Sequence, residues 1–140
     1  MLLTWMSERP KPVLNVATAN DITRLPPEMV RTGRFDGISF VDLPSAPNRR
    51  DILAIHLRKR CLDPAQFDLA ALTAATDGFS GSEIEQAIVS SMYTAHAQGR
   101  AMSQADLLTE IKQTRPLSVL MAEKVQEIRD WAAERTVPCD

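Results

Sequence analysis

The sequence contains few glycines and no recognisable phosphate-binding loop. Its five glycines are at positions 33, 37, 78, 81 and 99, and none of them precedes a Lys-Ser or Lys-Thr pair. A loop of the form G-x-x-x-x-G-K-[ST], whose backbone cradles nucleotide phosphates, is therefore absent. An apolar strand ending in Asp-Glu, which would hold Mg²⁺, is absent as well. The sequence as given lacks the elements that grip nucleotide phosphates and their metal.

The composition excludes several further classes of protein. The chain has 140 residues, 44% of them hydrophobic and 24% charged, which fits one globular domain or two small ones. A net charge of −2 gives no bulk attraction to nucleic acid or anionic lipid. No apolar run approaches the roughly 20 residues of a membrane span, and the first residues do not resemble a signal peptide. We expect a cytoplasmic protein without membrane contact.

Cysteine is scarce, with only Cys61 and Cys139. The two residues lie far apart in the sequence and match no metal-ligand spacing. We expect both to be free thiols in a reducing compartment, and we predict no metal site.

The first 44 residues predict part of an α/β sheet. Residues 13–18, VLNVAT, are nearly all apolar or β-branched, which is typical of a buried parallel strand, and residues 38–43, ISFVDL, predict a second strand. Pro26 can open a short helix between them, and Gly33 can end it. Two strands do not form a stable parallel sheet alone, so we interpret the chain as a piece of something larger.

After Pro44 the sequence predicts only helices. Ser80 with Glu83 forms a capping box, and Ser103 with Asp106 predicts a second capped start. The predicted helices cover about 46–60, 68–76, 81–98, 104–113 and 119–135. The predicted fold class is therefore mostly α: a two-strand α/β remnant followed by an all-α helical bundle.

The expected domains are an α/β part over residues 1–44, a helical part over 45–115 and a helical extension over 116–140. The extension predicts an amphipathic helix with Trp131 near the edge of its apolar face. The apolar face consists of Met121, Val125, Ile128 and Ala132. The helix would pack against the preceding bundle or dock on a neighbouring subunit.

Residues 13–36 contain the strongest candidates for chemistry. Asn20 follows the carboxyl end of a predicted buried strand, where ligands bind in open α/β sheets. Arg31 and Arg34 flank Gly33, and the planar guanidinium group suits phosphate oxygens. Alternatively, Asn20 caps a turn and the two arginines are solvated near a helix end. The joint pattern at this spacing favours a role in phosphate chemistry.

Residues 19–36 resemble the second region of homology of the AAA family of ATPases. The resemblance implies that Asn20 is the sensor-1 residue, which helps hold the attacking water near the γ-phosphate. It also implies that Arg31 and Arg34 are arginine fingers acting on ATP bound to the adjacent subunit. Such a finger typically raises the rate by about 10³–10⁵.

Two further segments resemble the helical lid of the same family. Residues 43–56, LPSAPNRRDILAIH, resemble its linker and first helix, which implies that Ile52 and His56 pack around adenine. Residues 78–84, GFSGSEI, resemble the turn before its third helix, which implies that Gly81 and Ser82 approach adenine and ribose. Many family members have Ala-Asp where this sequence has Ser82 and Glu83. Alternatively, Ile52 is a core residue, His56 is partly buried with a hydrogen-bond partner, and the turn only caps a helix.

The resemblance implies the C-terminal part of an AAA ATPase. The longer parent would use ATP and Mg²⁺, would assemble as a homo-oligomeric ring of six subunits, and would remodel a protein or other macromolecule. The fragment alone would be inactive and would bind no cofactor tightly. Residues 114–138 resemble a poorly characterised subgroup found in bacteria and algal chloroplast genomes.

Two rival interpretations remain open. One is a non-catalytic helical adaptor derived from a lid. A true start codon at Met1 would favour this adaptor, whereas an in-frame phosphate-binding loop upstream would favour the ATPase. The other is nucleic-acid binding by the basic residues Arg49, Arg50 and 58–60. We expect these basic residues to form a solvated helix face instead.

Overall fold

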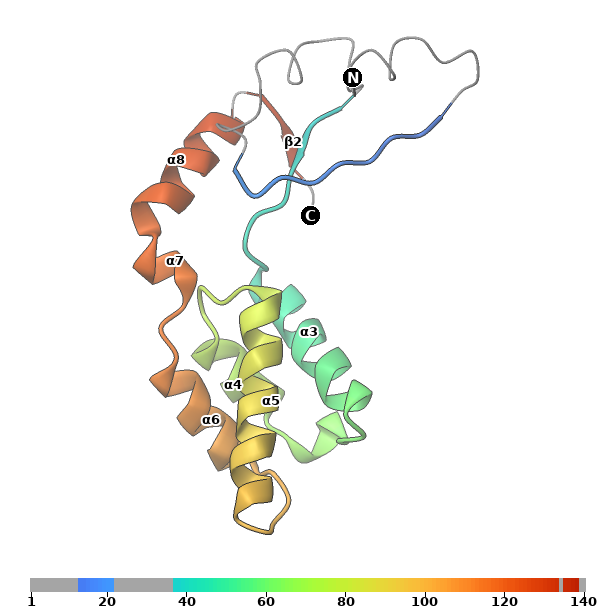
Figure 1. The fold of residues 1–140 in the computed structure, drawn as a ribbon, viewed down its shortest axis with the longest axis vertical. Helices are drawn as coiled ribbons and strands as arrows, with labels where there is room; N and C mark the ends of the chain where they lie inside the picture. Colours follow the sequence, from blue (N-terminus) through green and yellow to red (C-terminus); the bar gives the residue numbers. More distant parts are fainter. Residues whose placement is uncertain (1–12, 22–36, 134, 139–140) are drawn as a thin grey trace. The chain divides into compact units, whose positions relative to one another are not determined.

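The computed structural model describes residues 13–21, 37–133 and 135–138. Contacts divide the chain into two units, one of residues 42–125 and one of residues 1–41 with 126–140. The described structure is mostly helical, with a single pair of two-residue strands (Figure 1). The predicted fold class, a mostly α protein with a small strand remnant, is confirmed.

The unit of residues 42–125 is a bundle of short helices around one core. Its elements are α3 (Ala46–Lys59), the 3₁₀ helix η2 (Pro64–Gln66), α4 (Leu69–Ala75), α5 (Gly81–Ala97) and α6 (Gln104–Gln113). The four α-helices lie close to their predicted ranges, whereas η2 was not predicted. Helix α3 packs against α4 and α5, and α6 packs against α4 and α5 (Figure 1). The buried core consists of Leu53, Leu57, Leu72, Phe79, Ile84, Ala87, Ile88, Leu107 and Ile111. The predicted helical periodicity thus places the apolar residues of several helices in one cluster.

Two helices of the bundle end in the same left-handed turn. After α3, the Leu62 amide donates to the Leu57 carbonyl at 3.0 Å, and Cys61 between them has a φ of 59°. After α5, Gly99 occupies the equivalent position with a φ of 69°. Glycine is usual here because a Cβ strains this backbone conformation, so Cys61 is the less favourable of the two.

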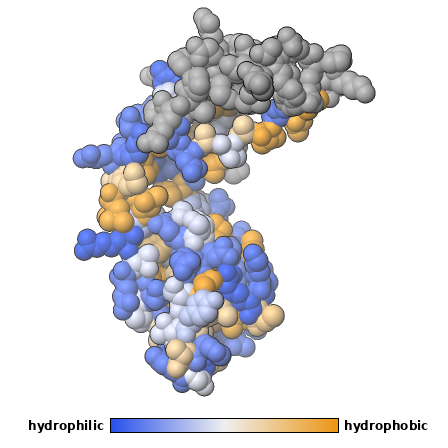
Figure 2. Space-filling view, viewed as in Figure 1, coloured by the Kyte–Doolittle hydropathy of each residue, from blue (hydrophilic) through white to orange (hydrophobic). Residues whose placement is uncertain are grey.

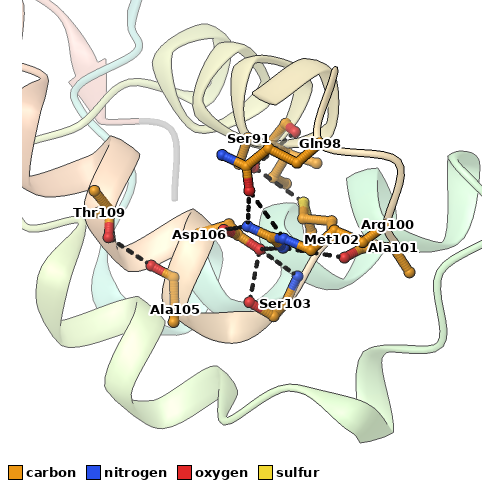
Figure 3. A network of polar contacts seen from close by, with 10 residues as sticks. Ser91, Gln98, Arg100, Ala101, Met102, Ser103, Ala105, Asp106 and Thr109 are labelled. Carbon is orange, nitrogen blue, oxygen red and sulfur yellow. Dashed lines mark hydrogen bonds and ion pairs between the residues drawn. The ribbon is translucent and has the colours of Figure 1, made fainter. Parts of the chain in front are cut away.

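A polar network closes the turn between α5 and α6 (Figure 3). The Arg100 guanidinium donates to both carboxylate oxygens of Asp106 at 2.6 Å, and Ser103 donates to Asp106 from its amide at 2.8 Å and its hydroxyl at 2.6 Å. These bonds, led by that from Arg100, hold the pKa of Asp106 far below its usual range. The predicted capped start at Ser103 is confirmed, with Arg100 as an additional partner.

The predicted C-terminal helix is broken into two. Helix α7 covers Leu117–Leu120, and α8 covers Ala122–Ala133 after a break at Met121. Ala132 on the predicted apolar face is buried, whereas Met121 is about half exposed. Hydrophobic side chains gather on the surface over α7 (Figure 2), and they are Leu117, Val119, Leu120 and Met121.

The predicted strand at residues 13–18 does not form. These residues have no regular secondary structure, and Leu14 and Val16 are more than 80% exposed. The second predicted strand is reduced to β1 (Ser39–Phe40), which pairs in parallel with β2 (Val137–Pro138) near the C-terminus. A strand needs a neighbour for its amide and carbonyl groups, and in the described part of the chain no segment supplies one to residues 13–18.

Candidate functional site

Ile52 and Gly81 are neighbours where α3 meets the start of α5. A Cβ atom added to Gly81 would lie 3.7 Å from Cδ1 of Ile52, which is ordinary van der Waals contact. Ile52 is half-buried and packs against the core, so its position also fits the alternative of a core residue. The structure therefore brings together two of the residues that the family resemblance assigned to adenine.

His56 lies one turn further along α3 and faces α5. Its Nδ1 lies 3.3 Å from Oε1 of Glu85 and 3.3 Å from NH1 of Arg60. The Arg60 NH2 group donates to the same Glu85 oxygen at 2.8 Å, and this bond is the main reason that the pKa of Glu85 lies below its usual value. His56 is thus a mostly buried histidine with polar partners, as the alternative interpretation expected, and it follows Ile52 on the same face.

Ser82 is exposed at the first turn of α5, beside the capping box. The Ser80 amide and hydroxyl donate to Oε2 of Glu83 at 2.8 and 2.7 Å, which confirms the predicted box. Burial raises the pKa of Glu83, but the hydrogen bonds from Ser80 and Leu117 outweigh it and lower the pKa below its usual value. The first turn of α5 therefore has a fixed geometry and a carboxylate that stays ionised at neutral pH.

Hydrogen bonds from the beginning of α7 hold the turn before α5. The Leu117 amide donates to Oε1 of Glu83 at 2.7 Å, and the Ser118 hydroxyl donates to the Gly78 carbonyl at 2.6 Å. Gly78 has a φ of 74°, and a Cβ there would lie 2.7 Å from the Ser118 hydroxyl oxygen. Only glycine fits this position without strain, for two independent reasons. Residues 117–118, at the start of the C-terminal extension, thus pack on the bundle, and the packing of the helix expected at 119–135 stays a prediction.

The expectation that the basic residues of α3 form a solvated face is wrong for Arg49 and Arg60. Arg49 is buried, and it donates to the Pro44 carbonyl at 3.0 Å and to Oδ1 of Asp77 at 3.0 Å. These bonds tie the residues before α3 to those after α4. Arg60 is largely buried against Glu85, whereas Arg50 and residues 58–59 are exposed. The sequence could not show this because the acceptors lie on other elements.

Three predicted catalytic residues are not placed in a site by the structure. Asn20 is exposed in a segment without regular secondary structure, in the unit that includes residues 1–41. Arg31 and Arg34 lie outside the described residues, as do the predicted short helix after Pro26 and Cys139. Cys61 is an exposed free thiol. Sensor-1 and finger roles therefore stay predictions.

Arg60 and Glu85, which contact His56, were not predicted from the sequence. Glu85 follows Gly81 by one helical turn, and Arg60 follows His56 by one turn, so each shares a helix face with a predicted residue. That spacing was the available signal, but the pairing between the two helices depends on how they pack.

Among the described residues no group of three or more His, Cys, Asp or Glu could hold a metal ion. No helix in that part of the chain is long and apolar enough to cross a bilayer.

Comparison with known proteins shows that the chain belongs to the AAA family and corresponds to a C-terminal region of it. No family model matches. The AAA domain-containing protein ycf46 of Gracilaria tenuistipitata var. liui is 45% identical over 94% of this chain, and that of Pyropia yezoensis is also 45% identical over 94%. The proteasome-activating nucleotidase of Aeropyrum pernix is 35% identical over 71% of the chain. The matches cover 27%, 27% and 24% of these relatives, so the chain spans about a quarter of their length.

Proposed function

We propose that this chain is the lid and interface part of an ATPase that hydrolyses ATP between subunits to remodel a macromolecular substrate. The observation that carries the proposal is the juxtaposition of Ile52 with Gly81 and of His56 with the same helix. These residues come from two segments that resemble the AAA lid, and they meet along one seam between α3 and α5. A seam with an aliphatic side chain, an imidazole and a close backbone suits a flat, partly apolar base such as adenine.

In the proposal the remaining roles belong to residues before Pro44. Asn20 orients the attacking water, and Arg31 and Arg34 reach the nucleotide of the neighbouring subunit. A finger that acts in trans requires a neighbour, so the working form is a ring, for which we propose a hexamer. ATP and Mg²⁺ are bound mainly by a phosphate-binding loop and an acidic strand end, which the present sequence does not contain.

The decisive experiment uses a full-length parent that contains the phosphate-binding loop. Replacing Arg34 with alanine should leave ATP binding nearly intact and lower turnover by about 10³-fold or more, because a finger acts on the transition state. Arg50→Ala, on the exposed face of α3, is the matched control and should retain normal turnover. Turnover near the wild-type rate in the Arg34 variant would show that the finger assignment is wrong.

The isolated chain provides a second test. It should not hydrolyse ATP and should bind it only weakly, because the groups that hold the phosphates are not in this sequence. Isothermal titration calorimetry should give no micromolar binding. A micromolar dissociation constant would contradict the proposed division of labour between the lid and the phosphate-binding part.

A helical adaptor without catalysis is the second candidate. The observation in its favour is the exposed apolar surface of α7, whose side chains are 47–65% exposed at Leu117, Val119, Leu120 and Met121. The two candidates differ in one measurable property. A full-length parent that binds a partner protein but never turns over ATP would favour the adaptor.

A further inference from the structure

The imidazole of His56 has two polar neighbours at the same ring nitrogen. Nδ1 lies 3.3 Å from Oε1 of Glu85 and 3.3 Å from NH1 of Arg60. The carboxylate can only accept a hydrogen bond, and the guanidinium can only donate one. A neutral ring cannot satisfy both neighbours, because Nδ1 either carries a proton or offers a lone pair. The two tautomers of His56 therefore differ in which neighbour they satisfy.

Arg60 does not need the ring nitrogen as an acceptor. Its NH1 group donates to the His56 carbonyl at 3.1 Å, and its NH2 group donates to Oε1 of Glu85 at 2.8 Å. A bare Nδ1 would place its lone pair against an ionised carboxylate, whereas a protonated Nδ1 would form a charge-assisted bond with it. Arg60 also keeps that carboxylate ionised, since its hydrogen bond lowers the pKa of Glu85. The balance favours the proton on Nδ1.

We propose that Glu85, oriented by Arg60, holds neutral His56 in the tautomer with its proton on Nδ1 and leaves Nε2 as an acceptor for the amino group of adenine. Among the described residues, His56 forms its polar side-chain contacts through Nδ1, and Nε2 has no hydrogen-bond partner. Guanine carries a carbonyl oxygen where adenine carries its amino group, so it cannot donate there. Glu85 and Arg60 are thus positioning residues that favour adenine over guanine. The inference rests on the proposed function of the α3–α5 seam.

The first experiment reads the tautomer directly in the 140-residue chain. Long-range ¹H–¹⁵N correlation spectra at about pH 8, above the usual pKa of histidine, distinguish protonated from bare ring nitrogens. The chain has two histidines, and the His96→Gln variant, changed at an exposed position, assigns the signals of His56. We expect a protonated Nδ1 and a bare Nε2. Free histidine prefers the opposite tautomer, so the expected result differs from the default.

Two variants test the cause. In Glu85→Ala the population should shift toward the tautomer protonated on Nε2, because the acceptor is gone and Arg60 NH1 is the remaining neighbour of Nδ1. Glu110→Ala, which removes a carboxylate from α6, is the control and should not change the tautomer. A wild-type spectrum with Nε2 protonated, or a Glu85→Ala spectrum like the wild type, would overturn the proposal. The wild-type result decides even if a variant fails to fold.

The second experiment separates the tautomer from the proposed function. Millimolar AMP should shift the Nε2 signal of His56, and GMP at the same concentration should shift it much less. Equal shifts with the two nucleotides would overturn the claim of specificity. If the expected tautomer is seen but neither nucleotide moves the signal, the assignment of the seam to adenine fails, while the positioning role of Glu85 stands.

Discussion

The bundle of residues 42–125 and the segment of residues 13–21 are both rich in apolar residues, yet only the bundle buries them. In the bundle, Leu53 and Ile88 are fully buried by helices that pack on one another. In the segment, Leu14 and Val16 are exposed and form no strand. A helix satisfies its backbone within itself, whereas a strand depends on a neighbour. The comparison shows that local pattern suffices for a helix and not for a strand.

The largest expected difference in stability between the two regions comes from shortening one apolar side chain in each. Leu53→Ala should destabilise the bundle by about 3 kcal/mol, because it removes fully buried methyl groups and leaves a cavity. Val16→Ala, at a position 81% exposed, should change stability by less than about 0.5 kcal/mol. Urea unfolding followed by circular dichroism measures both. Similar losses would mean that residues 13–18 contribute to the folded core.

The hydrogen-bonded contact between α7 and the turn before α5 gives the next largest expected effect on stability. Gly78→Ala should cost about 2 kcal/mol, because it adds a clash with the Ser118 hydroxyl to the strain of a positive φ. Gly99→Ala has a similar φ of 69° but open space around it, so it should cost only about 1 kcal/mol. Thermal unfolding compares the two variants. Equal losses would show that Ser118 does not constrain the turn.

Cys61 offers a smaller effect of the opposite sign. Cys61→Gly should stabilise the bundle by about 0.5–1 kcal/mol, because glycine adopts the left-handed conformation at the end of α3 without strain. Cys61→Ala keeps the strain and removes only the thiol, so it should leave stability nearly unchanged. Melting temperatures under reducing conditions test the pair. A glycine variant that is no more stable than the alanine variant would show that the backbone of Cys61 is not strained.

Glu83 gives the smallest effect, and it depends on pH. Its pKa is lower in the folded chain than its ordinary value of 4.5, so its ionised form adds stability above that value and loses it as the pH falls below. Glu83→Gln should therefore be less stable than the wild type by about 0.5 kcal/mol at pH 7. The difference should shrink below about pH 4.5. Urea unfolding at several pH values, with Glu110→Gln as the control, measures it.

The candidate site was partly predictable from the sequence. Ile52 and His56 were placed on one face of a helix by their spacing, and the capping box of Ser80 and Glu83 was identified by its residue types. Two contacts join residues that are far apart in the sequence. His56 and Glu85 are 29 positions apart, and the hydrogen bond from Ser118 to Gly78 spans 40 positions. Local periodicity carries no information about such pairs, because they depend on the packing of separate helices.

By itself, the sequence determined the helices of the bundle, their capped starts and the missing phosphate-binding loop, because these depend on residues within a few positions of one another. Only the tertiary structure decided that Arg49 is buried, that Glu85 faces His56, and that β1 pairs with β2 instead of with residues 13–18. Each of these outcomes depends on which distant segment supplies a hydrogen-bond partner, and a partner is chosen only when the helices and strands pack.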